Sequence, residues 1–346
     1  MIELKGVTKL YQGQAVPAVQ NLSLSINRGE ICVFVGPSGC GKSTTLRMIN
    51  RMIEPSSGTI EIDGKNIMSS DPDSLRMGIG YVIQQIGLLP HRTIAENIAI
   101  VPRLYKWPKE KIKSRVNELL EMMGLDPAET RNKYPSQLSG GQMQRVGVAR
   151  AMAVDPSIML MDEPFGAVDP VARNRLQDEF LRLQKEINKT IVFVTHDINE
   201  AIKMGDKIAI LNQGQLIQFG TPEEILTDPA NDFVENFIGY DRIVKKLNLY
   251  TVAEAMKTSF GLVDEAEFSG INAKIPNAEV IFVRDQGEQL VGYLTAEDLS
   301  AQGAQRLTQV ARQKRLSFVK LNTPLPDALS LMLENDADYA PEKGVN

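Results

Sequence analysis

The sequence predicts an α/β fold: a core with a mostly parallel sheet, followed by a small α+β region toward the C-terminus. Three short runs, at 31–35, 158–161 and 191–195, are almost continuously apolar, as expected for strands that are covered on both faces. Between them lie segments with helical spacing, such as 109–123, where apolar residues recur every three or four positions. Buried strands that alternate with helices are typical of an α/β domain.

Length and charge limit the classes of protein that fit. A chain of 346 residues, 43% of them apolar, can form one large core and one smaller core, at about 100–200 residues per domain. Its net charge of −5 gives no reason to expect a nucleic-acid partner. The basic run Lys106–Lys113 is interpreted as a solvated helix start.

The cysteines and the apolar runs indicate a reducing compartment and a chain without membrane spans. Cys32 and Cys40 fit neither a disulfide framework nor a zinc site. The first residues lack the basic lead and apolar stretch of a signal peptide. The apolar runs are far shorter than the roughly 20 residues that a spanning helix needs. Any role at a membrane is therefore expected to depend on partner chains.

A phosphate-binding loop is predicted between the strand at 31–35 and a helix expected from Ser43 to Met52. The residues there fit the pattern G-x-x-x-x-G-K-[ST]. Backbone N–H groups at a helix N-terminus attract phosphate, while Lys42 adds a positive charge and the Ser43 hydroxyl a magnesium ligand. A chance glycine-rich turn would not combine the strand, the spacing and the helix. The predicted nucleotide contacts are Gly36, Pro37, Ser38, Gly39, Cys40, Gly41, Lys42, Ser43 and Thr44.

Two consecutive carboxylates, Asp162 and Glu163, follow the apolar run at 158–161. Successive side chains of a strand point to opposite faces, so the two residues cannot do the same work. We expect Asp162 to hold magnesium and Glu163 to polarise the attacking water as a general base. Two acidic residues after a strand would, by themselves, indicate only a turn. The presence of Lys42 upstream favours the catalytic interpretation.

The segment 138–142, Leu-Ser-Gly-Gly-Gln, resembles the signature of ABC ATPases. That resemblance implies an ABC ATPase core at 1–238, with a mostly parallel sheet, an antiparallel β part and a helical subdomain at about 85–150. It also implies a homodimer, because in this family the signature faces the γ-phosphate that another subunit holds. The signature contacts to ATP would come from Ser139, Gly140, Gly141 and Gln142.

Four further positions match landmarks of the same family, in the order in which the family has them. Tyr11 matches the aromatic residue that stacks on adenine. Gln84 matches the glutamine that reaches magnesium and the attacking water; Gln85 is the one-residue alternative, and its spacing to the Pro-His pair that follows favours Gln84. Asp169 matches the residue that couples the two sites of the dimer, and His196 matches the histidine that contacts the γ-phosphate. The resemblance thus implies catalytic roles for Glu163, His196 and Gln84.

The segments 81–91, 161–170 and 195–201 resemble the ATPases of osmoprotectant importers, whose substrates include glycine betaine, choline, carnitine and proline. In these systems two ATPase chains dock at the cytoplasmic face of the cell membrane beneath two permease subunits, and an extracytoplasmic binding protein delivers the solute. The substrate does not touch the ATPase chain, so its identity follows from the resemblance alone. Three alternatives stay open: an importer ATPase for another amino acid or a sugar, a soluble ABC ATPase that acts on ribosomes or DNA, and a module that senses ATP without hydrolysing it.

The region 239–346 is predicted to be a separate regulatory region. Two similar pieces, Thr251–Met256 and Thr323–Leu329, indicate an internal repeat. Strands expected at 280–283 and 290–294, followed by a capped helix start at 295–298, resemble one CBS unit.

Two features of this region depart from the CBS pattern. Pro276 interrupts the helix expected before Val280, and the second unit stops at 339–341 without the strands and helix that should follow. Related modules respond to ionic strength or bind a cyclic dinucleotide, and either role is a hypothesis for this region.

Overall fold

The computed structural model describes residues 2–83, 87–166, 170–257, 260–265, 279–287, 289–301 and 304–341. The chain divides into two compact units, Met1–Tyr240 and Asp241–Asn346. Within the residues described, no helix has the length and apolar character needed to cross a membrane.

A six-stranded sheet forms the centre of the first unit, in the order β10-β9-β3-β8-β7-β6. All neighbours pair in parallel except β9 and β10, which are antiparallel. Every residue of the three central strands β3, β7 and β8 is buried, as their continuous apolar runs predicted. The strands are β3 (Ile31–Val35), β6 (Ile79–Val82), β7 (Ile158–Asp162), β8 (Thr190–Val194), β9 (Lys207–Asn212) and β10 (Gln215–Gly220).

An antiparallel sheet, in the order β2-β1-β4-β5, packs against this one. Apolar residues of both sheets belong to one core cluster, in which Ile2 and Leu22 join Phe34 and Val192. The two sheets therefore share a single core. The strands are β1 (Ile2–Lys9), β2 (Val19–Ile26), β4 (Ser57–Ile62) and β5 (Lys65–Asn66).

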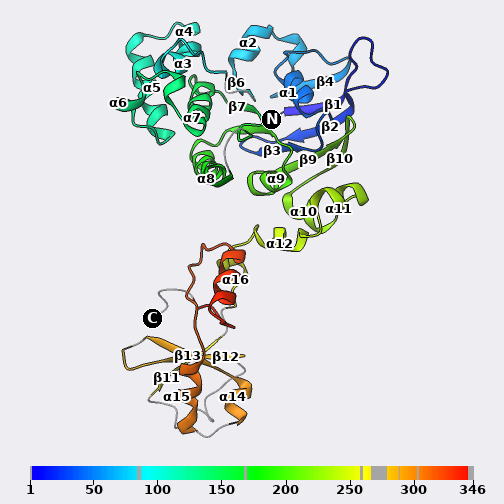
Figure 1. The fold of residues 1–346 in the computed structure, drawn as a ribbon. Helices are drawn as coiled ribbons and strands as arrows, with labels where there is room; N and C mark the ends of the chain where they lie inside the picture. Colours follow the sequence, from blue (N-terminus) through cyan, green and yellow to red (C-terminus); the bar gives the residue numbers. More distant parts are fainter. Residues whose placement is uncertain are drawn as a thin grey trace. The chain divides into compact units, whose positions relative to one another are not determined.

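A group of helices lies between β6 and β7 in sequence, and Figure 1 shows it gathered on one side of the unit, away from the antiparallel sheet. The helix expected at 109–123 is α5, where Val116, Leu119 and Leu120 are buried. The group consists of α3 (Ile94–Ile98), α4 (Ile100–Leu104), α5 (Lys109–Met122), α6 (Pro127–Thr130), the short η2 (Pro135–Gln137) and α7 (Gly140–Ala151).

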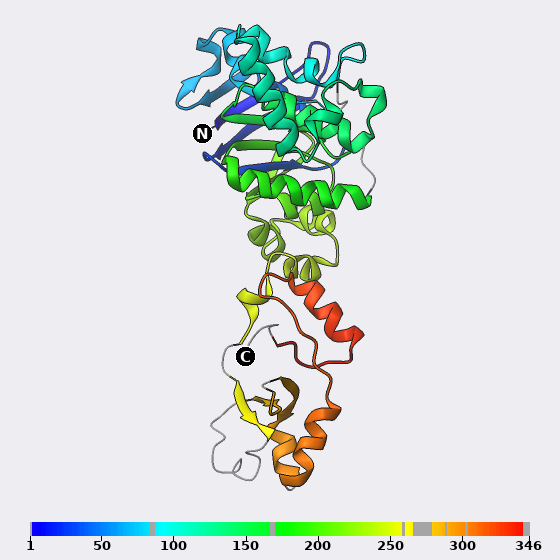
Figure 2. The same ribbon diagram turned by 90° about the vertical axis from the view of Figure 1, so that its left-hand side faces the viewer.

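The helix after the phosphate-binding loop, α1 (Lys42–Ile49), is shorter than predicted. It was expected to run to Met52, but Arg51 has a left-handed backbone with φ 48°, which a continuing helix cannot accommodate. Figure 2 shows α8 as a long helix beside the strands of the first unit. The remaining helices of this unit are η1 (Ile67–Ser69), α2 (Pro72–Met77), α8 (Pro170–Ile187), α9 (Ile198–Met204), α10 (Pro222–Thr227) and α11 (Asp232–Ile238).

The second unit contains a three-stranded sheet, in which β12 pairs with β11 in parallel and with β13 in antiparallel orientation. Thr295 begins α14 with the predicted cap, since its backbone N–H donates to Asp298 Oδ2 at 2.7 Å. The elements are α12 (Arg242–Leu247), α13 (Val252–Ala255), β11 (Gly261–Asp264), β12 (Val280–Arg284), β13 (Leu290–Thr295), α14 (Ala296–Ala301), α15 (Ala304–Gln313) and α16 (Leu325–Glu334).

The two similar pieces of the second unit lie against each other. The Val252 N–H donates to the Thr323 carbonyl at 2.9 Å, and the Leu325 N–H donates to the Tyr250 carbonyl at 3.0 Å. Each piece leads into a helix, but Thr251 is the N-cap of α13 whereas Pro324 is the N-cap of α16, so the two pieces are similar without being equivalent residue by residue. Pro276 lies outside the described residues.

Candidate functional site

The phosphate-binding loop connects the end of β3 to α1. Gly36 has φ 151° and Gly41 has φ 103°, values that other residues rarely adopt. A Cβ atom on Gly36 would lie 2.1 Å from the Leu211 carbonyl oxygen, and one on Gly41 would lie 2.4 Å from that of Ala18. Only glycine fits at these two positions, which explains part of the motif.

Lys42 is buried at the first position of α1. Its Nζ donates to the carbonyls of Gly36 (2.7 Å) and Pro37 (2.9 Å), so the ammonium group is held inside the loop. The first N–H groups of a helix have no acceptor within it, and the residue before Lys42 is a glycine, which has no side chain to cap them. The positive charge and these N–H groups make the loop suited to an anion such as a phosphate.

The Ser43 hydroxyl donates to Asp162 Oδ1 at 2.8 Å, joining α1 to the end of β7. Asp162 is buried, with 3% of its surface exposed. Burial raises the pKa of Asp162, and the hydrogen bond from Ser43 and the charges of Arg47 and Lys42 oppose that rise. A carboxylate and a hydroxyl oxygen are the hard ligands that Mg²⁺ prefers, so this pair fits a magnesium ion bound together with a phosphate.

Glu163 follows Asp162 with a left-handed backbone, φ 47°. Two backbone hydrogen bonds fix this conformation: its N–H donates to the Val194 carbonyl at 2.9 Å, and its carbonyl accepts from Gly166 N–H at 3.1 Å. Its Oε1 lies 3.4 Å from His196 Nδ1, in a contact whose donor depends on the imidazole tautomer. A strained residue held by its surroundings is typical of a functional site.

The signature segment begins α7, where Ser139 is the N-cap. The Gln142 N–H donates to Ser139 Oγ at 3.3 Å, and the Ser139 N–H donates to Gln142 Oε1 at 3.0 Å, forming a capping box. Ser139 and Gly140 are exposed. The N-terminus of α7 is therefore ordered and exposed, two properties that a helix N-terminus needs if it is to bind an anion.

The remaining predicted residues differ in burial, and two of them lie outside the described residues. Tyr11 is half-buried, with Lys9 Nζ 5.3 Å from its ring centroid. Cys40 is buried in the loop, where burial raises the pKa of its thiol. Gln84 and Asp169 lie outside the described residues.

Sequence reasoning missed Asn97, a fully buried residue of α3 that organises the segment 87–93. Its Oδ1 accepts from the Leu89 N–H at 2.7 Å, and its Nδ2 donates to the carbonyls of Leu89, Arg92 and Thr93 at 3.0–3.1 Å. Arg150 Nη1 donates to the Gly87 carbonyl at 2.7 Å. An amide in an otherwise apolar helix face was the available signal, but its partners are set by the fold.

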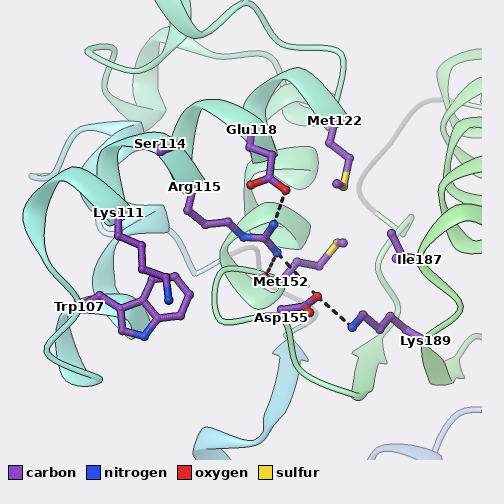
Figure 3. A pocket seen from close by; sticks show the side chains of 10 residues that line it. All are labelled: Trp107, Lys111, Ser114, Arg115, Glu118, Met122, Met152, Asp155, Ile187 and Lys189. Carbon is purple, nitrogen blue, oxygen red and sulfur yellow. Dashed lines mark hydrogen bonds and ion pairs between the residues drawn. The ribbon is translucent and has the colours of Figure 1, made fainter.

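A groove of about 530 Å³ lies between α5 and the core of the first unit (Figure 3). Arg115 donates to the carbonyls of Met152 (3.1 Å) and Ala153 (3.3 Å), and Asp155 pairs with Lys189 at 2.9 Å. None of its lining residues is a predicted site residue. These contacts connect the helical group to the sheet, so we assign the groove a structural role. The groove is lined by Trp107, Lys111, Ser114, Arg115, Glu118, Met122, Met152, Asp155, Ile187 and Lys189.

The fold and the loop around Lys42 define a P-loop nucleotide-binding protein. Residues 19–166 match the family described as ABC transporter. The chain is 47% identical to the carnitine transport ATP-binding protein OpuCA of Listeria monocytogenes, over 99% of this chain and 87% of that protein. It is also 47% identical to the glycine betaine/carnitine/choline transport ATP-binding protein OpuCA of Bacillus subtilis, over 99% of this chain and 90% of that protein.

Among solved structures, the chain resembles the dimeric ATP-binding cassette MJ0796 in a post-hydrolysis state bound to ADP and Pi. The TM-score is 0.58 and the identity 38%, over 64% of this chain and 99% of that one. The chain belongs to the family of ABC transporter ATPases.

Proposed function

We propose that this chain hydrolyses ATP to drive a binding-protein-dependent importer of quaternary-amine osmoprotectants, such as glycine betaine, carnitine or choline. The observation that carries the ATPase part is the arrangement of Lys42, the Ser43–Asp162 pair and Glu163 at one end of the sheet. The solute class is supported by relatives that match nearly the whole chain and are named as transporters of these compounds.

ATP binding is proposed to use the phosphate-binding loop. The N–H groups of α1 and the Lys42 ammonium would hold the phosphates, since both supply positive charge at one point. Tyr11 would contribute an aromatic face for the adenine. Mg²⁺ would be held by the Ser43 and Asp162 oxygens and by Gln84, and when bound it neutralises charge on the phosphates.

Hydrolysis is proposed to depend on Glu163 as general base. Water attacks the γ-phosphorus, the bond to the ADP oxygen breaks, and the water proton passes to the Glu163 carboxylate. His196, 3.4 Å from that carboxylate, would contact the γ-phosphate and hold the reacting groups in line. The fixed backbone of Glu163 supports this role because it presents the carboxylate without a reorganisation step.

Two copies of the chain are proposed to form the working ATPase. The N-terminus of α7 is ordered by the Ser139–Gln142 capping box and exposed, so it can meet a phosphate held by a second copy. Each ATP would then lie between Lys42 of one copy and Ser139 of the other, and Asp169 would couple the two sites. The dimeric state named for the similar cassette supports this arrangement.

The chain is proposed to act at the cytoplasmic face of the cell membrane, attached through two permease subunits and served by an extracytoplasmic binding protein. The family supports this location, since its members power transport across membranes.

The second unit is proposed to be a CBS-like regulatory region, with an incomplete second repeat. A cavity of about 530 Å³ lies inside this unit, where Val252 and Leu325 of the two similar pieces meet Phe282 of β12. Such a cavity supports the binding of a small ligand such as a cyclic dinucleotide, and sensing of ionic strength is the alternative proposal.

Reconstitution in proteoliposomes tests the transport proposal. The chain would be assembled with its permease and binding protein, and ATP-driven uptake of glycine betaine, choline, carnitine, proline and a sugar would be compared. We expect uptake of the quaternary amines, and none with Glu163→Gln. Uptake of the sugar alone would contradict the solute assignment. Varying the internal salt, with and without residues 241–346, tests the regulatory role.

A further inference from the structure

A buried carboxylate, Glu200 of α9, lies next to the candidate site and belongs to none of the groups described above. It is 7% exposed. Its Oε2 accepts a hydrogen bond from Thr195 Oγ1 at 2.6 Å, and its Oε1 accepts one from Gln177 Nε2 at 3.2 Å. Arg173 Nε lies 3.8 Å from the same Oε1. Burying a carboxylate is costly even when it is paired, so its presence here calls for a role.

One side of Glu200 fixes the turn that carries His196. Thr195 is 2% exposed, and its N–H donates to the Phe34 carbonyl at 3.1 Å, which ties the turn to β3. The Thr195 hydroxyl accepts from the Asp197 N–H at 3.0 Å while it donates to Glu200. The Thr195 backbone is therefore held by β3, and the Asp197 N–H is held by the Thr195 hydroxyl, whose direction Glu200 sets.

The other side of Glu200 contacts the start of α8. Gln177, which is 2% exposed, and Arg173 lie one turn apart in the N-terminal half of this helix. The helix begins at Pro170, the residue after Asp169. Farther along α8, Phe180 packs against Phe165, with ring centroids 6.2 Å apart. Glu200 thus bridges the His196 turn and α8.

We propose that Glu200 is a positioning residue: by connecting the His196 turn to α8, it keeps the His196 side chain in place beside Glu163. The inference rests on the proposed function, because it takes the roles of Glu163 and His196 from there. It goes beyond that function by adding a residue that touches neither ATP nor the reacting water.

The chemistry of the bridge requires a carboxylate. Thr195 on one side and Gln177 with Arg173 on the other all present donors, so position 200 must accept on both sides. Glu200→Gln keeps the volume but removes the negative charge that faces Arg173, and it keeps both hydrogen bonds only if the Gln177 amide turns over. In the double variant Glu200→Gln/Gln177→Glu, the new amide can accept from Thr195 and donate to the new carboxylate. This exchange restores a carboxylate beside Arg173 and keeps both hydrogen bonds of the bridge.

The test compares ATP hydrolysis by the full chain, the single variant, the double variant and Asp178→Asn. Asp178 is the control because it joins the same two helices through an exposed ion pair with Lys203 at 2.8 Å. Glu200→Gln should lower kcat by about 10-fold, with KM for ATP and the number of nucleotide-binding sites nearly unchanged, as expected for a misplaced catalytic group. The double variant should recover most of this loss, and Asp178→Asn should match the wild type.

Three results would overturn the inference. The first is an unchanged kcat in Glu200→Gln. The second is a loss of kcat matched by an equal loss of nucleotide-binding sites, which would mean that the residue only keeps the protein folded. The third is a double variant that binds ATP normally but stays as slow as the single one. If the wild-type chain bound ATP without hydrolysing it, the proposed function itself would be wrong.

Discussion

In the unit that ends at Tyr240, several buried polar side chains lie next to the loops that follow β3, β7 and β8; in the described part of the unit that begins at Asp241, buried side chains are mostly apolar. Lys42, Asp162 and Glu200 are examples from the first unit, whereas the described part of the second unit buries few polar groups, such as the hydroxyls of Ser317 and Tyr293. Buried polar groups cost free energy unless they are paired. In the first unit such groups lie at the proposed ATP site, while the second is stabilised by apolar clusters such as Val283, Leu294 and Ala311.

Lys42→Ala should have the largest effect of these variants on ATP binding, because it removes a buried charge of the first unit. The Lys42 ammonium is the buried charge closest to where the phosphates are proposed to lie, so its loss should weaken ATP binding by about 10- to 100-fold. Equilibrium binding of a fluorescent ATP analogue measures this, with Lys65→Ala, at an exposed position of β5, as the control. Unchanged affinity in Lys42→Ala would refute the phosphate-binding role of the loop.

Asn97→Ala should show what a buried polar residue contributes away from the phosphates. The change leaves the Leu89 N–H and the carbonyls of the 87–93 segment without their partner, at a cost of about 3 kcal/mol in the free energy of unfolding. Chemical denaturation of the first unit measures this, and Asn132→Ala, at an exposed position of the same helical group, is the matched control. Equal stability of the two variants would contradict the proposed organising role.

Gly292→Ala should destabilise the second unit through packing alone. A Cβ atom there would lie 1.8 Å from the Ala311 carbonyl oxygen of α15, and such overpacking costs about 1–3 kcal/mol. Gly287→Ala, on an exposed turn of the same unit, should be neutral. We expect a lower melting temperature for the second unit and unchanged ATP hydrolysis by the isolated chain. A parallel fall in ATPase rate would show that the two units are coupled in this chain.

Asp162→Asn should change stability the least, and it should raise stability, whereas Asn97→Ala and Gly292→Ala lower it. The native pKa of Asp162 is raised above 3.8, so the folded state binds a proton more tightly than the unfolded chain does. Its contribution to stability is therefore present at low pH and is lost as the pH rises from 3.8 through the native pKa. At neutral pH the variant should melt at a slightly higher temperature while magnesium-dependent hydrolysis is lost. A lower melting temperature would contradict the pKa argument.

The parts of this account that could be predicted from sequence are those with local causes. The strands at 31–35 and 158–161 and the loop before Lys42 follow from apolar runs and from glycine spacing. The end of α1 was placed too late because the left-handed turn at Arg51 has no strong local signal. Glu200 could not be found because its partners, Thr195 and Gln177, come together only when α8 and α9 pack on the sheet.

Glu163→Gln tests the central claim most directly, namely that this chain hydrolyses ATP with Glu163 as general base. The variant keeps the size and most hydrogen bonds of the side chain but cannot take the water proton. We expect ATP to bind with unchanged affinity and hydrolysis to fall by about 100-fold or more. Hydrolysis at the wild-type rate, with ATP bound as tightly as before, would contradict the account.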